Sequence, residues 1–498
     1  MPEGNAPADR LLLVPDAVVV RADADVAVGA ALLIENGRVA SVGPPAALRR
    51  SAPLAPVREL PGRVLLPGLV DGHSHLRGLP TCAHDIPDGP LEQWVVRLAA
   101  MAPVDPGADA LVAAVDAVST GITTTQVLHH AFAGEDGYLA ALAGTVAGLR
   151  TAGLNAEVVV ALTDQSEFIP AELEAELDEE QRRWLVPDRG VGPDRFDALV
   201  TGAEALLAAA SDPGPSAPWL RLGVAPVGPQ WASDRLLATI ARHTGPERRV
   251  HTHAVETRAQ RAWGPESPID RLERHGLLTS ATSIAHAVHV TDAEVALLAA
   301  AGTAIVSCPT SNARVSDGSG DVVGWLTAGV TVGLGLDSVG HPELPDAFAE
   351  LRTLQTTARA RARHLDARTA LSIATLGGAI AAGRADRIGT LEPGRDADLI
   401  AVRTPGVWRD GDEPDLIEGV VATSTRASIT DVFSAGAPVV VDGRHRAADA
   451  VRAARDSLTE ALRATAPERA RRRTRIAALE PLVERVRHER TRAAATTR

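Results

Sequence analysis

Lysine is absent from this 498-residue chain, and all 50 of its basic side chains are arginines. The absence excludes Schiff-base chemistry, a phosphate-binding lysine and a carbamylated lysine that bridges two metal ions. Cysteine is almost absent too, since Cys82 and Cys308 are the only two. A disulfide-stapled secreted scaffold is therefore excluded, and a reducing, cytoplasmic location is favoured.

Long apolar runs are also missing. No stretch approaches the roughly 18–20 uninterrupted apolar residues that a membrane span needs, and Met1–Arg10 lacks the basic and apolar segments of a signal peptide. We therefore expect no membrane contact. Acidic residues outnumber basic ones by 63 to 50, giving a net charge of −13, so nucleic acid is not an expected partner. The length and the 45% apolar share predict a globular protein with a large core.

Short strands are predicted near both ends of the chain. Ala31–Ile34 and Val39–Val42 flank the dipeptide Asn36-Gly37, which favours the positive φ angles of a tight hairpin turn. Similar strand-and-turn patterns recur far along the chain, at Ile388–Val402 and Ile429–Gly443. We expect one small β unit built from both termini.

Between these segments, apolar strand-like runs alternate with helical stretches. Because such alternation builds a parallel sheet, eight runs over roughly 300 residues predict a (β/α)₈ TIM barrel of the α/β class. The expected domains are residues 1–65 and 386–446 for the two parts of a composite β-sandwich, 66–385 for the barrel and 447–498 for a helical tail. The eight runs are Val64–Val70, Ile122–Leu128, Ala156–Leu162, Leu220–Val227, Arg249–Val255, Ser283–Val290, Thr303–Ser307 and Val330–Leu336.

The tail beyond Ala447 is rich in alanine, arginine and glutamate. It is predicted to be helical, with interruptions at Pro467 and Pro481. Its run Arg471-Arg472-Arg473 is interpreted as part of a solvated or subunit-packing helix, because the whole chain is acidic. A homo-oligomer is compatible with this interpretation.

Histidines and carboxylates gather where the predicted strands end, which is the edge at which barrel enzymes carry out their chemistry. His73 and His75 follow the first strand and share one face, because alternate residues of a strand point the same way. Imidazoles and a carboxylate with room for water are typical of an open, catalytic zinc-type site. The later strand ends carry His251, His253, Glu256, His286 and Asp337.

Taken in order, these motifs resemble the amidohydrolase superfamily, in its branch of cytosine deaminases, guanine deaminases, adenosine-derivative deaminases and triazine hydrolases. The resemblance spans roughly residues 10–445 and implies a metal-dependent hydrolase with a barrel and a terminal β-sandwich. It is carried by PGLVDGHSH at Pro67–His75, GITT at Gly121–Thr124, VHTHAVET at Val250–Thr257, Ile284–His286, CPTSN at Cys308–Asn312, VGLGLD at Val332–Asp337 and TLEPGRDADL at Thr390–Leu399.

The resemblance also implies a role for each strand-end residue. His73, His75, His253 and Asp337 would hold the metal, Glu256 would move protons, and His286 would contact the attacking water or the developing oxyanion. His251 is an alternative ligand to His253, but the three-residue spacing to Glu256 favours His253. Without lysine we expect one divalent ion, with Zn²⁺ favoured and Fe²⁺ or Mn²⁺ accepted by the same ligands.

The implied reaction is hydrolysis of a carbon–nitrogen bond other than a peptide bond. Metal-bound hydroxide, oriented by Asp337, would attack a small heterocyclic or amidine-like substrate and release ammonia or an amine. Loss of a halide, an alkylamine or a cyclic amide is an alternative. A non-catalytic scaffold is a further alternative. It predicts that some metal-binding residues have been replaced, whereas all four implied metal ligands and Glu256 are present in this sequence.

Four further residues are candidates for substrate binding. Gln230 and Trp231 follow the fourth strand and offer an amide and an aromatic plane, although Gln230 is equally suited to capping a helix. Arg258 could bind an anion or be an exposed helix charge. His341 could line the pocket or be a lone loop histidine. With only 13 aromatic residues (five Phe, one Tyr, seven Trp), no specific purine or pyrimidine is predicted.

Overall fold

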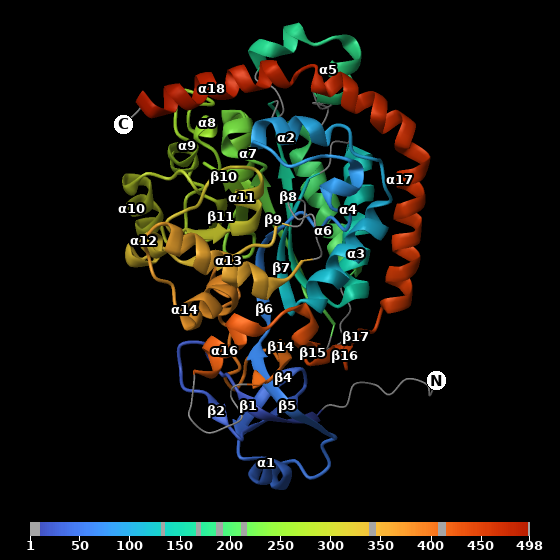
Figure 1. The fold of residues 1–498 in the computed structure, drawn as a ribbon, viewed down its shortest axis with the longest axis vertical. Coiled ribbons are helices and arrows are strands. Elements are labelled where there is room, and N and C mark those ends of the chain that lie inside the picture. Colours follow the sequence, from blue (N-terminus) through green and yellow to red (C-terminus); the bar gives the residue numbers. More distant parts are fainter. Residues whose placement is uncertain are drawn as a thin grey trace.

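The structure is a computed structural model that describes residues 10–130, 135–165, 171–185, 193–210, 217–337, 345–406 and 415–496. A mixed sheet lies at one end of the molecule, and the parallel strands and their helices form the rest (Figure 1). The α/β class predicted from the sequence is confirmed. None of the described helices is both long enough and apolar enough to cross a membrane.

The mixed sheet contains strands from both ends of the chain. Its order is β17-β16-β15-β14-β5-β1-β3-β4, with β2 paired to β1. The two ends meet where β14 runs antiparallel to β5, with Leu399 opposite Pro67. The strands are β1 (Arg10–Val18), β2 (Ala27–Val28), β3 (Ala31–Glu35), β4 (Arg38–Gly43), β5 (Val57–Pro67), β14 (Leu399–Arg403), β15 (Ile429–Ser434), β16 (Ala437–Val441) and β17 (Arg444–His445).

The predicted hairpin is present. β3 and β4 pair antiparallel, with Glu35 opposite Arg38. Asn36 and Gly37 have φ angles of 50° and 74°, which is the conformation of a type I′ turn and explains why this dipeptide marks it.

The parallel strands form two four-stranded sheets, in the orders β6-β7-β8-β9 and β10-β11-β12-β13. Backbone hydrogen bonds cross between the sheets on both sides: His253 N–H donates to Val227 O at 3.1 Å, and Asp337 N–H donates to His73 O at 2.9 Å. The strands are β6 (Leu69–Ser74), β7 (Ile122–His129), β8 (Asn155–Leu162), β9 (Leu220–Pro226), β10 (Val250–Ala254), β11 (Thr282–His286), β12 (Ala304–Ser307) and β13 (Val332–Leu334).

Two of the predicted strand ranges are wrong in a way that matters for the site. The run Val64–Val70 joins the end of β5 to the start of β6, with Gly68 between them. A Cβ on Gly68 would overlap the Thr123 side chain, so this junction requires glycine. The run Ser283–Val290 ends as a strand at His286, because His286 and Ala287 have left-handed φ angles of 67° and 51°.

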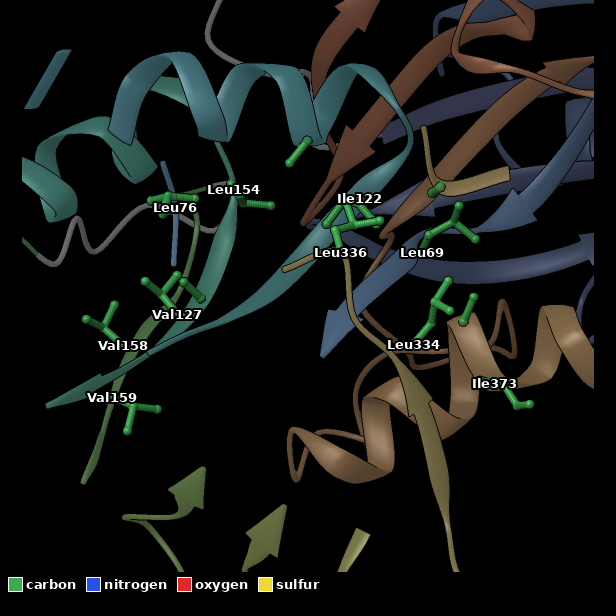
Figure 2. Packing of buried hydrophobic residues seen from close by; sticks show 14 of the residues in the cluster. Leu69, Leu76, Ile122, Val127, Leu154, Val158, Val159, Leu334, Leu336 and Ile373 are labelled. Carbon is green, nitrogen blue, oxygen red and sulfur yellow. The ribbon is translucent and has the colours of Figure 1, made fainter. Parts of the chain in front are cut away.

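Side chains of the parallel strands and of the helices that cover them make up the large core. Every residue of β7 and β8 is buried, as expected for parallel strands that are covered on both faces. Figure 2 shows Val127, Val158 and Leu334 among the packed side chains of this cluster.

Helices cover the parallel strands, and the tail wraps around them (Figure 1). α17 packs on α3, and α18 packs on α2 and α8. The predicted interruption at Pro467 is wrong, since α17 continues through it, whereas Pro481 does lie in the first turn of α18. The helices are α1 (Pro45–Ser51), α2 (Leu91–Leu98), α3 (Pro106–Ser119), α4 (Glu135–Ala152), α5 (Glu179–Leu185), α6 (Phe196–Ala210), α7 (Asp234–His243), α8 (Arg258–Arg261), α9 (Pro268–Arg274), α10 (Asp292–Ala301), α11 (Pro309–Arg314), α12 (Val322–Thr327), α13 (Ala347–Ala360), α14 (Ala367–Ser372), α15 (Gly378–Ala381), α16 (Leu416–Thr423), α17 (Ala448–Ala477) and α18 (Glu480–Thr496).

Candidate metal centre

Five predicted side chains converge at the ends of β6, β10, β11 and β13. One potential ligand atom from each of His73, His75 and His253 lies within 4.8 Å of the others, and the same is true of His73, His286 and Asp337. Nε2 of His75 is 3.2 Å from Nε2 of His253. Oδ1 of Asp337 lies 3.7 Å from Nε2 of His73 and 3.7 Å from Nε2 of His75.

Unusual backbone conformations end the strands that carry these residues. Leu76, Val255, His286 and Asp337 have φ angles of 53°, 46°, 67° and 46°. Non-glycine residues rarely adopt this region, and for a β-branched residue such as Val255 it is an outlier. Strain of this kind gathers at functional sites, where the surrounding structure enforces it. Here it turns the chain sharply at the point where the site side chains are presented.

The protonation of the histidines suits a metal ion. Burial lowers the pKa of His73 well below its ordinary value. Burial, together with the nearby His75, lowers the pKa of His253 to about 4. Both imidazoles are therefore neutral at pH 7, and each keeps one lone pair. Nδ1 of His253 donates to Val227 O at 2.7 Å, so the lone pair of His253 is on Nε2, facing His75.

A buried orphan atom supports the same conclusion. Nε2 of His73 is inaccessible to solvent and has no hydrogen-bond partner within the described ranges. Neutral imidazole nitrogens and one carboxylate oxygen are a donor set that Zn²⁺ and related divalent ions accept. The residues present thus fit the metal that the sequence predicts.

Two further side chains position Asp337 and His73. Ser311 donates to Oδ2 of Asp337 at 2.6 Å, which leaves Oδ1 directed at the histidines. Burial alone would raise the pKa of Asp337, but the nearby His75 and His286 outweigh burial, so the pKa lies below its ordinary value. Asp71, only 2% exposed, accepts hydrogen bonds from the backbone N–H groups of Leu336 at 2.8 Å and His73 at 3.2 Å. Sequence reasoning missed Asp71, although it lies within the motif that carries His73.

Glu256 and His286 lie next to each other. Glu256 is 5% exposed, and its Oε1 is 3.6 Å from Nδ1 of His286. Nδ1 of His286 also lies 2.8 Å from Oδ1 of Asn312, an acceptor. The backbone N–H of Glu256 donates to Oε1 of Gln260 at 2.9 Å. The backbone of Glu256 and the imidazole of His286 are thus both held, with the Glu256 carboxylate beside the imidazole.

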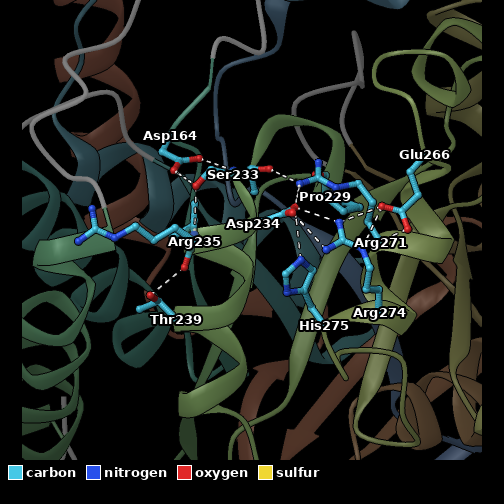
Figure 3. Close-up of polar contacts among 12 residues, drawn as sticks. Asp164, Pro229, Ser233, Asp234, Arg235, Thr239, Glu266, Arg271, Arg274 and His275 are labelled. Carbon is cyan, nitrogen blue, oxygen red and sulfur yellow. Dashed lines mark hydrogen bonds and ion pairs between the residues drawn. The ribbon is translucent and has the colours of Figure 1, made fainter.

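Gln230 and Trp231 lie in the short helix η4 (Pro229–Trp231) and are both buried. Neither the oxygen nor the nitrogen of the Gln230 amide has a hydrogen-bond partner among the residues described. Arg271 fixes this segment, because its guanidinium donates to Pro229 O at 2.6 Å and to Ala232 O at 2.8 Å (Figure 3). Trp231 also packs edge-to-face with Trp263, with ring centroids 6.3 Å apart.

Arg258 and His341 are placed differently from the other candidates. Arg258 is exposed and borders a pocket of about 140 Å³ that is also lined by Thr257 and Asp317. The guanidinium of the nearby Arg261 is already paired, since it donates to the Glu294 carboxylate at 2.7 Å. His341 lies outside the described residues.

Two structural features were not among the candidate site residues predicted from the sequence. Burial lowers the pKa of His130 well below its ordinary value, and His75 and His253 act in the same direction. The sequence feature that could have pointed to His130 is its position directly after the strand β7. The second feature is the tail, because Arg487 and Thr491 of α18 line the pocket beside Thr257.

Comparison with known proteins gives consistent matches. The amidohydrolase family model matches residues 64–439. The 5-methylthioadenosine/S-adenosylhomocysteine deaminase of Desulforudis audaxviator is 30% identical over 428 residues, covering 82% of this chain and 87% of that protein. The 8-oxoguanine deaminase of Pseudomonas aeruginosa is 27% identical over 445 residues, covering 84% and 93%. The zinc-bound structure of an adenosine deaminase from Xanthomonas campestris has a TM-score of 0.72 at 27% identity, covering 91% and 98%. The family match includes every strand from β6 to β13.

Proposed function

Because the chain belongs to the amidohydrolase family, we propose that it is a metal-dependent aminohydrolase. In this proposal it hydrolyses a carbon–nitrogen bond, other than a peptide bond, of a small heterocyclic or amidine-like substrate. The observation that carries the proposal is the convergence of His73, His75, His253 and Asp337 on one point beside Glu256. The relatives named as deaminases support an amino group as the leaving group.

One divalent ion, with Zn²⁺ first and Fe²⁺ or Mn²⁺ as alternatives, would be held by His73, His75, His253 and Asp337. Such an ion, when bound, supplies Lewis acidity and makes hydroxide available near neutral pH. The carboxylate of Glu256 takes the first proton of the attacking water and delivers it to a ring nitrogen. It then takes the second proton, from the hydroxyl newly bonded to the ring carbon, and delivers it to the leaving nitrogen as the carbon–nitrogen bond breaks. Proton transfer of this kind typically contributes about 10²–10⁴-fold. His286, held by Asn312, hydrogen-bonds the attacking water or the oxygen on which negative charge develops.

The substrate would lie against η4. The unpartnered amide of Gln230 offers both a donor and an acceptor to a heterocycle edge, and leaving it unpaired is unfavourable in a buried site. Trp231 and Trp263 provide an apolar wall. Arg258 at the rim, and His341, complete the proposed substrate contacts.

We further propose that the two parallel sheets close into one (β/α)₈ barrel. The hydrogen bonds between β9 and β10, and between the end of β13 and β6, support closure. The proposal keeps the domain boundaries at residues 65, 385 and 446, and it keeps a β-sandwich formed by the terminal sheet. The consecutive residues Leu12 and Leu13 belong to different apolar clusters, which supports a terminal sheet that is covered on both faces. It also includes a cytoplasmic location, a small-molecule partner without nucleic acid or membrane, and a homo-oligomer.

The test is ammonia release across a panel of aminated heterocycles, with metal content measured on the same samples. The panel contains 5-methylthioadenosine, S-adenosylhomocysteine, adenosine, 8-oxoguanine, guanine, cytosine and chlorinated or alkylaminated triazines. We expect Glu256→Gln to lower kcat by about 10²–10⁴-fold with an unchanged metal content. The matched control Glu204→Gln changes an exposed carboxylate on α6 and should leave kcat unchanged. Unchanged turnover in Glu256→Gln would refute the assigned role, and release of halide or alkylamine alone would favour the other leaving groups.

A further inference from the structure

His251, which the sequence leaves open as an alternative ligand, is fully buried and has both ring nitrogens engaged. Its Nε2 lies 2.8 Å from Nδ1 of His73, and its Nδ1 lies 2.8 Å from Oγ of Ser283. It does not belong to either ligand cluster found in the described part of the chain. His251 and Ser283 are directly opposite each other in the β10–β11 register, so neighbouring strands place both side chains in one layer beneath the metal ligands.

The hydrogen-bond chain has one consistent direction. Oγ of Ser283 donates to Oε1 of Gln126 at 3.3 Å, and the same Oγ can therefore accept from Nδ1–H of His251. A neutral imidazole carries one N–H, so Nε2 of His251 has a lone pair and accepts from Nδ1–H of His73. The remaining nitrogen of His73, Nε2, then keeps its lone pair and points toward Asp337 and His75.

We propose that His251 is a positioning residue for the metal centre: it holds His73 as the Nδ1–H tautomer and fixes its ring, so that Nε2 of His73 is presented to the cation. This inference rests on the proposed function, since it takes His73 as a metal ligand. Metal-binding histidines usually donate their second N–H to a carboxylate, a carbonyl or water. His253 follows this pattern, because its Nδ1 donates to Val227 O.

The Nδ1–H of His73 is accepted by an imidazole nitrogen of His251, whereas the Nδ1–H of His253 is accepted by the carbonyl oxygen of Val227. A carbonyl oxygen accepts in every protonation state, whereas an imidazole nitrogen accepts only when the proton sits on its other nitrogen. Ser283 and Gln126 supply that condition by taking the proton of Nδ1. Without His251, the Nδ1–H of His73 would be buried and unpaired, which is unfavourable. Moving the proton to Nε2 of His73 would remove the ligand lone pair.

The test compares zinc affinity in three variants, measured by competition with a chromogenic chelator. His251→Phe removes the acceptor and keeps a ring, and it should raise the zinc dissociation constant about 10–100-fold. His251→Gln offers a carbonyl oxygen to Nδ1–H of His73 and should restore most of the affinity. His445→Phe is the matched control, since His445 is also a buried, hydrogen-bonded histidine but lies in the terminal sheet. It should leave zinc affinity unchanged.

Two further measurements separate positioning from general destabilisation. The visible spectrum of the Co²⁺-substituted protein should change in His251→Phe and return toward wild type in His251→Gln. Thermal unfolding of the metal-free proteins should show His251→Phe no less stable than His445→Phe. If His251→Phe does not fold, Ser283→Ala tests the same chain, with an expected affinity below wild type.

Wild-type zinc affinity in His251→Phe would overturn the inference, and so would a His251→Gln variant that binds zinc as weakly as His251→Phe. Wild-type affinity in Ser283→Ala would overturn it where that variant is the one tested. A wild-type chain that binds no divalent ion would instead overturn the proposed function, and this inference with it.

Discussion

Ile476→Ala should loosen α18 from the rest of the protein. Ile476 is 1% exposed and lies at the end of α17, directly before α18. Ile476, Leu479 and Val483 are the tail's buried members of one apolar cluster. Its other buried members are Val96, Ala100, Leu177 and Leu185. The substitution deletes three carbon atoms from a fully buried position, and such deletions cost about 2–5 kcal/mol.

The cost should appear locally rather than in the whole fold. Because 1.4 kcal/mol corresponds to a factor of ten, a loss of about 2 kcal/mol should lower the hydrogen-exchange protection of α18 amides about 30-fold. Exchange of peptides from residues 480–496, followed by mass spectrometry, measures this directly. Leu482→Ala is the matched control, because Leu482 is only partly buried in the same cluster, and its effect should be smaller.

Protection within threefold of wild type in Ile476→Ala would refute this reasoning. It would mean that polar contacts hold α18, foremost the paired hydrogen bonds of Arg97 to Glu480 at 2.8 and 2.9 Å.

Three other predictions concern stability. Tyr138→Phe removes a hydroxyl that donates to His129 O at 2.8 Å and accepts from Ala161 N–H at 3.1 Å; we expect a loss of about 1–3 kcal/mol in urea unfolding, and a loss below about 0.5 kcal/mol would contradict it. Burial raises the pKa of Asp398 from 3.8 to about 7, so the folded state binds the extra proton and stability falls as pH rises from about 4 to about 7. Asp398→Asn should flatten that fall in melting temperature against pH, and parallel curves would speak against it. Adding zinc at 100 times its dissociation constant to the metal-free protein should stabilise it by about 2.7 kcal/mol, which calorimetry would show, and identical melting curves would rule out a bound ion.

The cluster of proposed ligands is largely predictable because each of its residues lies at or just after a strand end within a short motif. His73 and His75 share a face through simple alternation, and the structure brings them to His253, His286 and Asp337 as expected. The role of His251 is not predictable in this way. It depends on Ser283 and Gln126, which meet it only because β7, β10 and β11 fold together.

Local sequence patterns do not predict every backbone conformation of this protein. Nothing in the residue type indicates that Val255 adopts a left-handed conformation, because a β-branched side chain strongly disfavours it. The strand that was expected to continue to Val290 ends at His286, because His286 and Ala287 both have left-handed φ angles. The prediction for Pro467 fails in the other direction, since α17 continues through a residue that local preference would place at a helix end.

The tail illustrates the limit of composition. Its arginines suggest a solvated face, yet Arg469 is buried and donates to Asp85 at 2.9 Å, and Arg473 donates to the same carboxylate at 3.0 Å. The partner is a residue in a loop after β6. No charge pattern within the tail identifies that partner.

The direct continuation of β5 into β6 through Gly68 has a consequence for biosynthesis. The strand that leads to His73 is anchored by β5, and β5 completes its pairing only with β14, which is made much later. A growing polypeptide must therefore carry an open strand edge while the intervening residues are translated, and open edges invite association between chains. Slow translation or chaperone capture during that interval should raise the yield of active molecules, whereas rapid overproduction should favour inclusion bodies.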